Sequence, residues 1–396
     1  MSNNYDVDQR ENYEMLDNEA NLFAKFFEKL QKETKEMGHA NLIIAGKTGV
    51  GKSTLINAAF REDIAKTGIG KPVTEEGDVK WFEKEGFPLR IYDTIGLELD
   101  EKRRERSLEL IKKECKEAKK SNNPDKFIHA MWYCVGAYSD RLEDYEADYI
   151  NSVAEEVDVI LVITKAYKKR RAEKLVNAIN QDYPNLNVRN KVIVLAQDED
   201  PNDCDEDDIP KKAYGLDTLI EVTAQIIPES AQRAWCNAQK ASIELKVNKA
   251  HAVVMATAAT AFGEGFIPIP FSDCLAIIPT QLGMLAGITA FFGINVSKNL
   301  LKTLVTTIVG EAGATIAGRA VVAGLLKLIP GCGSAIGGAI SGATASIITV
   351  ALGEAYIAIM KMIATGEISE KDLGDKKVQE KMKKIFKENL TKKSQK

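Results

Sequence analysis

The fold class follows from one glycine-rich motif, Gly46-Lys47-Thr48-Gly49-Val50-Gly51-Lys52-Ser53. The motif fits the pattern of Gly, any four residues, then Gly-Lys-Ser/Thr, and it lies between an apolar run at residues 41–45 and a second run at 53–59. This order predicts a strand, a glycine loop and a helix. Glycines let successive backbone N–H groups converge on an anion, and the new helix adds the positive end of its dipole. We therefore expect a phosphate-binding loop in an α/β fold.

The composition argues against several other classes of protein. A chain of 396 residues predicts about two or three domains. The net charge of −4 gives no indication of nucleic-acid binding, so we expect no nucleic-acid partner. The six cysteines form no Cys-x-x-Cys pair and the three histidines lie far apart, which argues against a zinc site or a disulfide framework. The first residues lack the basic and apolar layout of a signal peptide.

Two further motifs follow the glycine loop. Residues 67–77 are polar and glycine-rich, as a mobile loop should be, and Thr74 lies in this loop. Residues 78–82 and 89–92 alternate like the strands of a hairpin, and the second run ends in Asp93-Thr94-Ile95-Gly96. A carboxylate at the end of such a strand is suited to hold a magnesium-bound water. Gly96 is able to bring its backbone N–H close to a γ-phosphate because it has no side chain.

The motifs GKTGVGKS, PVT and DTIG resemble the first three nucleotide motifs of Era-like GTPases in the translation-factor-related class. The resemblance implies a P-loop NTPase fold with a Ras-like G domain, whose sheet is mixed and mostly parallel, and it implies GTP or GDP with Mg²⁺ as ligands. Lys52, Thr74 and Gly96 are the implied catalytic residues, and Ser53, Thr74 and Asp93 the implied magnesium ligands. The implied nucleotide-binding residues in these motifs are Gly46, Lys47, Thr48, Gly49, Val50, Gly51, Lys52, Ser53, Thr54 and Asp93.

Two positions bear on hydrolysis. In Ras-like enzymes a Gln directly after the DxxG glycine orients the attacking water, whereas this chain has Leu97 there. Some relatives use an Asn at the fourth position of the loop to bind an activating potassium ion, and this chain has Gly49. We therefore expect a slow GTPase without potassium activation.

The fourth nucleotide motif is altered. The strand expected at residues 157–163 ends in Thr164-Lys165-Ala166-Tyr167, where the resembled family has Asn/Thr-Lys-x-Asp. Lys165 is expected to lie over a purine ring, but Tyr167 replaces the Asp that accepts two hydrogen bonds from guanine, and one phenol cannot copy a bidentate acceptor. Asp198, after the last expected strand at 192–196, is a candidate substitute. We expect guanine to be preferred over adenine.

Two further charged segments, residues 101–120 and 198–208, are interpreted as solvated surface. Residues 101–120 predict a charged helix with Leu108, Ile111 and Cys115 on its inner face, and residues 141–156 an acidic helix. The acidic run at 198–208 lacks the glycine and the bidentate glutamate of a calcium loop.

The C-terminal half resembles a second known domain. Residues 213–239 predict two helices broken at Pro228, and residues 265–274 are rich in proline. Both features are similar to a bacterial subgroup in which an Era-like GTPase precedes a YcjF-type hydrophobic domain of unknown function. Residues 274–298 carry no charge before the last position and 331–353 carry none, and each run exceeds the ~18 residues typical of a spanning helix. Membrane insertion or tight membrane association and a compact soluble helical bundle both remain open.

The ends of the chain are amphipathic. Residues 16–37 predict a helix that packs on the nucleotide domain or, alternatively, associates with a partner or another copy. The lysine-rich tail docks on the protein's own core or lies on an anionic membrane. The expected domains are an N-terminal amphipathic helix (1–38), a G domain (39–212), a helical connector (213–249), a Gly/Ala-rich hydrophobic helical domain (250–366) and a basic amphipathic tail (367–396).

Two functions are compatible with these features. The first is a GTPase with slow hydrolysis whose nucleotide state controls a hydrophobic helical module at the cytoplasmic side of a membrane. The second is a nucleotide-binding scaffold, cytoplasmic and with little or no hydrolysis, that orders self-association of a soluble bundle. The expected partners are a guanine nucleotide, a membrane surface or bilayer, and further copies of the chain.

Overall fold

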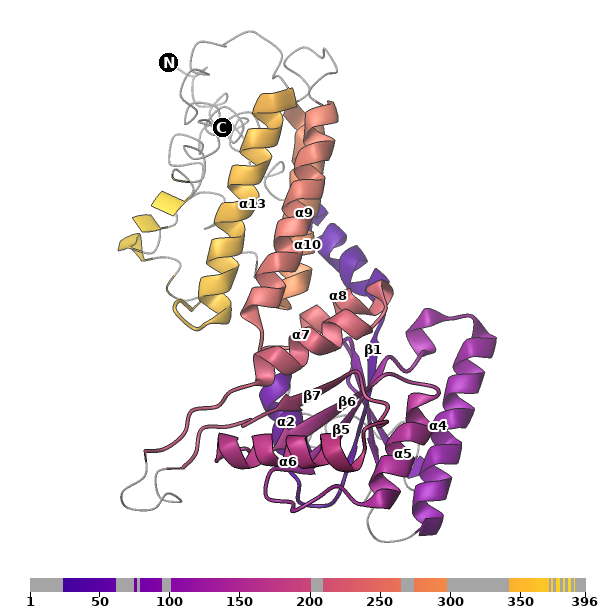
Figure 1. The fold of residues 1–396 in the computed structure, drawn as a ribbon. Coiled ribbons are helices and arrows are strands. Elements are labelled where there is room, and N and C mark those ends of the chain that lie inside the picture. The colour runs from indigo at the N-terminus through magenta and orange to yellow at the C-terminus, as the bar shows by residue number, and fades with distance from the viewer. Residues whose placement is uncertain are drawn as a thin grey trace, which may run out of the picture. The chain divides into compact units, whose positions relative to one another are not determined.

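The computed structural model describes residues 24–61, 75–76, 79–94, 101–200, 209–264, 274–297 and 342–369, with isolated positions between 372 and 388. The chain divides into two compact units, each described here by itself (Figure 1). The sheet unit comprises Met37–Ser242. The helical unit comprises the described residues before Met37 and those from Ile243 onward.

Seven strands form one sheet in the described part of the sheet unit, in the order β2-β3-β4-β1-β5-β6-β7. Their bounds are β1 Ala40–Gly46, β2 Glu75–Glu76, β3 Val79–Glu83, β4 Leu89–Thr94, β5 Ala130–Gly136, β6 Val159–Thr164 and β7 Asn190–Ile193. The five strands from β4 to β7 in this order are parallel neighbours, whereas β2–β3 and β3–β4 are antiparallel. The predicted mixed, mostly parallel sheet is confirmed.

Helices cover both faces of this sheet (Figure 1). Side chains alternate between the faces along a strand, so Tyr133 and Trp132 on β5 point to opposite layers. Tyr133 bonds to Glu146 of α5, and Trp132 bonds to Thr223 of α7. The layer on the Tyr133 side contains α4 (Glu101–Ser121), α5 (Asp144–Ala154) and α6 (Lys169–Asp182), and the other contains α2 (Lys52–Ala59), α7 (Leu216–Ile226) and α8 (Glu229–Ala238).

Three aromatic rings pack together between the sheet and the helices α7 and α8. Phe60 stacks on Trp132 with ring centroids 5.8 Å apart, and Trp235 meets both rings edge-on at 5.4 and 5.7 Å. All three side chains are buried. The sequence assigned residues 213–249 to a connector, whereas in the structure α7 and α8 belong to the sheet unit. The break between the two helices falls at Pro228, as predicted.

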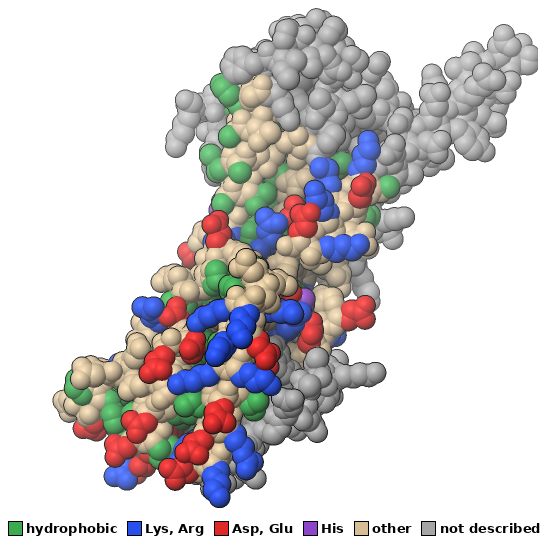
Figure 2. Space-filling model, turned by 90° about the vertical axis from the view of Figure 1, so that its right-hand side faces the viewer, with side chains coloured by type: hydrophobic (Ala, Val, Ile, Leu, Met, Phe, Trp, Pro, Cys, Tyr) green, Lys and Arg blue, Asp and Glu red, His purple; other side chains and the backbone are tan. Residues whose placement is uncertain are grey.

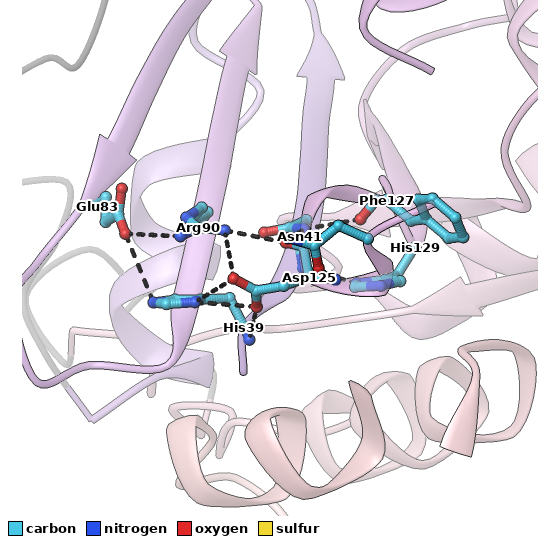
Figure 3. A network of polar contacts seen from close by, with 8 residues as sticks. His39, Asn41, Glu83, Arg90, Asp125, Phe127 and His129 are labelled. Carbon is cyan, nitrogen blue, oxygen red and sulfur yellow. Dashed lines mark hydrogen bonds and ion pairs between the residues drawn. The ribbon is translucent and has the colours of Figure 1, made fainter. Parts of the chain in front are cut away.

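A polar network lies at the amino ends of the parallel strands (Figure 3). The Asp125 carboxylate accepts the backbone N–H of His39 and lies 3.1 Å from Nδ1 of the same residue. Arg90 reaches Asp125 at 3.3 Å and Glu83 at 3.0 Å, and the His39 ring lies 3.5 Å from Glu83. Gly38 precedes His39 with φ +66°, and a Cβ there would lie 2.9 Å from the Asp125 carboxylate, so a glycine fits this turn.

The same network extends into the core through Asn41 and His129 (Figure 3). The Asn41 amide group donates to the carbonyls of Asp125 and Phe127 at 2.8 and 2.7 Å. Its backbone N–H donates to Nδ1 of His129 at 2.9 Å. Asp125 lies in the short helix η1 (Pro124–Lys126), so these bonds fix how the chain enters β1 and β5.

The described part of the helical unit contains three long helices, α9 (Ile243–Glu264), α10 (Cys274–Phe292) and α13 (Gly342–Ala364). Gly353 lets α13 approach α9 closely, since a Cβ there would lie 2.4 Å from the Val254 side chain. The buried Lys246 ammonium donates to the carbonyls of Phe291 and Phe292 at 3.1 Å each, which satisfies the C-terminal end of α10. The described part of the hydrophobic region is thus helical, as predicted.

The N-terminal helix packs in a different place from the one predicted. Residues 24–36 are helical, and Phe26, with 0% exposure, lies in the apolar core formed by α9, α10 and α13. The prediction that this helix packs on the nucleotide domain was therefore wrong, because its apolar face is covered by the helical unit instead. Ile385 of the tail packs against the same core.

The visible surface of the sheet unit mixes both charges. Figure 2 shows basic and acidic side chains interleaved on this face. On α4, Lys119 and Lys112 pair with Glu156 and Glu155 at 2.7 and 3.4 Å, whereas Ile111 and Cys115 are buried on the inner face. The solvated-face interpretation of α4 is thus confirmed. Within the described residues, no helix combines the length and apolarity required to cross a membrane.

Candidate nucleotide-binding site

The glycine motif forms the loop between β1 and α2. Gly46 ends β1 with φ +133°, and a Cβ there would lie 2.2 Å from the Cys134 carbonyl, so only glycine lets β1 and β5 pair at this point. Gly51 caps α2 with φ +100°. The first turn of α2 therefore opens directly onto the loop, with its N–H groups and dipole directed toward an anion. Ser53 and Thr54 lie exposed in that first turn.

Lys52 turns its side chain back over the loop. Its ammonium donates to the carbonyls of Gly46 at 2.8 Å and Lys47 at 3.2 Å. These bonds place the charge within the loop rather than in solvent. A phosphate cradled by the loop would lie close to this ammonium.

Two residues of the altered fourth motif, Thr164 and Lys165, contact the glycine loop. The Thr164 hydroxyl donates to the Val50 carbonyl at 2.6 Å. Lys165 adopts a left-handed backbone with φ +53°, which directs its side chain over Gly51; its Cε and Cγ lie 3.6 and 3.7 Å from where a Gly51 Cβ would be. The structure therefore brings Thr164 and Lys165 to the glycine loop; the predicted position of Lys165 over a purine ring stays a prediction.

The other predicted residues are only partly described. Asp93 pairs with Ile44 in the β4–β1 register, which places it two positions before the level of Gly46 at the carboxyl end of the sheet. Thr74 and Gly96, together with Leu97, lie outside the described residues. Ser53, in the exposed first turn of α2, supplies a hydroxyl oxygen, a ligand of the kind that Mg²⁺ prefers.

Tyr167, which replaces the usual guanine acceptor, and Asp198, the candidate substitute, both have partners within the protein. The Tyr167 ring lies 6.4 Å from that of Tyr138, which follows β5. The Asp198 carboxylate accepts hydrogen bonds from the Lys212 ammonium at 2.6 Å and the Ala213 backbone N–H at 2.8 Å. The hydrogen bond from Lys212 lowers the pKa of Asp198. Asp198 would have to share these contacts in order to accept from guanine.

Sequence reasoning missed the side-chain partner of Lys47. Its ammonium lies 3.0 Å from Glu146 of α5, whose side chain is 2% exposed. Burial by itself would lower the pKa of Lys47, but the hydrogen bond and charge of Glu146 raise it above the ordinary value. The spacing Glu143-x-x-Glu146 signals a helix cap, and the cap is present. It gives no hint of the contact with a loop 99 positions earlier in the chain.

Comparison with known proteins agrees with this site. The family described as 50S ribosome-binding GTPase matches residues 41–197. Neuronal-specific septin-3 of Bos taurus is 28% identical over 232 residues, which cover 50% of this chain and 63% of that protein. Translocase of chloroplast 108 of Physcomitrium patens is 31% identical over 133 residues, 33% of this chain and 12% of that protein. The chain thus spans less than two thirds of the length of these relatives.

A solved structure is similar at lower identity. The septin GTPase domain from Chlamydomonas reinhardtii is 17% identical with a TM-score of 0.29, and the match covers 42% of this chain and 77% of that one. The family match itself spans β1, the glycine loop, the strands up to β7 and the altered fourth motif. Together with the sheet order and the loop geometry, it shows that residues 41–197 have the P-loop GTPase fold.

Proposed function

We propose that this protein binds GTP and GDP in the loop between β1 and α2 and hydrolyses GTP slowly. The observation that carries the proposal is the convergence of Lys52, Thr164 and Lys165 on one glycine loop at the start of α2. Lys52 supplies a cation for the β- and γ-phosphates, and the first-turn N–H groups of α2 supply hydrogen bonds. The class that we propose is the Era-like one, with a YcjF-type helical domain.

We propose that Mg²⁺ binds at the same site. Ser53, Asp93 and Thr74 would hold the ion, and bound Mg²⁺ would neutralise charge on the β- and γ-phosphates. The proposed role of Lys52 does not depend on this ion. The order of ligands in the sequence, hydroxyl, threonine and strand-end carboxylate, supports the assignment.

Guanine is the base that we propose. The support is the GTPase family match over residues 41–197. The fourth motif itself gives no support, because Tyr167 replaces the Asp that would accept hydrogen bonds from guanine. The test is competition: a fluorescent GDP analogue bound to the full-length protein is displaced by unlabelled GTP or ATP. We expect GTP to displace it at a concentration at least about tenfold lower, since a factor of ten corresponds to about 1.4 kcal/mol, within the range for one hydrogen bond. Equal displacement by ATP would refute the guanine assignment.

Slow hydrolysis is proposed because the side chain of Leu97 has no hydrogen-bonding atom with which to orient a water. The second candidate, a scaffold with little or no hydrolysis, is favoured by the same residue. Steady-state phosphate release, measured with and without liposomes, separates the two. Release stimulated by liposomes supports the GTPase, and release no faster than that of Lys52→Ala supports the scaffold.

The helical unit is the proposed target of the nucleotide state. Residues 250–366 are unusually apolar, and the proposal is that they associate with a membrane on its cytoplasmic side or with other copies of the chain. The two covalent links to the sheet unit support control by nucleotide, since the chain crosses between the units at Met37 and again at Ser242. A ligand that distinguishes two conformations of the sheet unit would act on the helical unit through these links.

A further inference from the structure

Glu146 is a buried carboxylate with three donors around it. Its Oε1 accepts the Tyr133 hydroxyl at 3.0 Å, and its Oε2 accepts the Glu143 backbone N–H at 3.1 Å. The third donor is the Lys47 ammonium, 3.0 Å from the same Oε2. A buried carboxylate requires such partners, because an unpaired charge in the interior is costly.

A capping role accounts for only part of this arrangement. The cap of α5 uses the contact with the Glu143 N–H and needs neither a buried position nor a cation. The contact with Lys47 joins α5 to the second residue of the glycine loop. Lys47 is also held through its backbone, since its carbonyl accepts the Lys52 ammonium at 3.2 Å.

The Lys47 ammonium also lies over the ring of Tyr145, the residue before Glu146. The Tyr145 ring, next to Glu146 on α5, has the Lys47 ammonium 5.4 Å from its centroid and the Arg104 guanidinium of α4 at 4.4 Å. Both distances are those of cation–π contacts. Two consecutive residues in the first turn of α5, Tyr145 and Glu146, thus contact Lys47. Neither of them belongs to a nucleotide motif.

We propose that Glu146 is a positioning residue for the nucleotide. Acting through Lys47, it fixes the first turn of the glycine loop, so that the loop N–H groups and the Lys52 ammonium meet the phosphates in one geometry. The proposal rests on the proposed nucleotide binding and adds a residue that lies outside every nucleotide motif. In this proposal, the Lys47 side chain pairs with Glu146 and so fixes the loop. Lys52 is the lysine that contacts the phosphates.

The test is the dissociation constant of fluorescent GDP and GTP analogues for the full-length protein and three variants. Glu146→Gln removes the charge but keeps the size, and we expect its Kd to rise about tenfold, the lower end for losing a group that orients a ligand-binding residue. Tyr133→Phe is the matched control, because it removes another hydrogen bond of Glu146 without touching Lys47. It should lower the unfolding temperature and leave Kd within about twofold.

The third variant, Lys47→Met with Glu146→Gln, asks whether Glu146 acts through Lys47. The double variant avoids an unpaired buried carboxylate, and its Kd should equal that of Glu146→Gln alone. A clearly weaker double variant would mean that Lys47 contacts the phosphates directly, and would overturn the proposal. So would an unchanged or lower Kd for Glu146→Gln, or an equal rise for Tyr133→Phe. Wild-type protein that binds no nucleotide would instead overturn the proposed function itself.

Discussion

The Thr164 hydroxyl lies 2.6 Å from the Val50 carbonyl and donates a hydrogen bond to it. Thr164 ends β6 and is buried, whereas Val50 lies in the middle of the glycine loop. The fourth motif therefore contacts the glycine loop through Thr164, although Tyr167 stands where the resembled family has Asp.

Replacing Thr164 by Val should loosen the loop. The change keeps the shape but leaves the Val50 carbonyl without this donor, which should lower the free energy of unfolding by about 1–3 kcal/mol and weaken nucleotide binding. Thr164→Ser keeps the hydroxyl and is the matched control. Urea unfolding followed by tryptophan fluorescence reports on the sheet unit alone, since Trp81, Trp132 and Trp235 all lie within it. Equal stability of the Val and Ser variants would contradict the assigned role.

Lys52→Ala should abolish nucleotide binding while the fold survives. In the part of the chain that the structure describes, the ammonium donates to two loop carbonyls, at 2.8 and 3.2 Å, so its loss should cost little stability. The measurement is a titration with a fluorescent nucleotide, accompanied by urea unfolding. Unchanged affinity would remove the phosphate-loop assignment. Lys47→Arg, which preserves the pair with Glu146, is the control and should still bind.

Acid should weaken the sheet unit through His129. Burial lowers the pKa of His129 to about 4 from 6.5. The folded state therefore binds fewer protons than the unfolded state between these values, and stability falls as pH drops from about 6.5 toward 4. The loss attributable to His129 is about 3 kcal/mol at 1.36 kcal/mol per unit. His129→Asn keeps an acceptor near the position of Nδ1 for the Asn41 N–H, and it should flatten this part of the pH profile. An identical profile for the variant would show that other groups cause the acid sensitivity.

Asp125 should matter for stability although it is far from the loop. Asp125→Ala removes the acceptor of the His39 N–H and one partner of Arg90, and the expected loss is about 1–3 kcal/mol in urea unfolding. Asp125→Asn retains an acceptor for the N–H and should lose less. Nucleotide affinity should stay unchanged in both, because the network lies at the amino ends of the parallel strands (Figure 3), whereas Gly46 is the last residue of β1. A selective loss of affinity would mean that this edge communicates with the site.

The sequence predicted the elements of the sheet unit well because local signals govern them. The apolar runs at 41–45, 89–92 and 157–163 correspond to β1, β4 and β6, and Pro228 divides α7 from α8. The loop glycines were equally informative. Gly46 and Gly51 occupy backbone conformations that other residues avoid, so their type carries geometric information.

Long-range contacts were not predictable from the same signals. The amphipathic pattern of residues 24–36 says that one face is buried but not by what, and Phe26 enters the core of the helical unit. The sequence predicted an acidic helix at 141–156 but did not indicate that Glu146 is buried, because its counter-charge comes from Lys47, a residue distant in sequence. Asp198 looked free to contact a base, whereas Lys212 and Ala213 hold its carboxylate.

The last prediction concerns what the nucleotide controls. The run at residues 331–353 carries no charge and 274–298 only one, at its end, so lipid, another copy or the unit's own core must cover these segments. If nucleotide state controls the unit, its exposure must differ between the GTP and GDP forms, which requires that the ligand binds two conformations with different affinity. We expect more of the protein to co-sediment with anionic liposomes when it is bound to a non-hydrolysable GTP analogue than when it is bound to GDP.

The control is a protein truncated to residues 37–242, which should bind the nucleotide but stay in the supernatant, since it lacks the helical unit. Equal sedimentation with both nucleotides would support membrane association but contradict its control by nucleotide state. Sedimentation in neither state, with a concentration-dependent rise in molecular mass in the GTP analogue, would point instead to other copies of the chain as the cover.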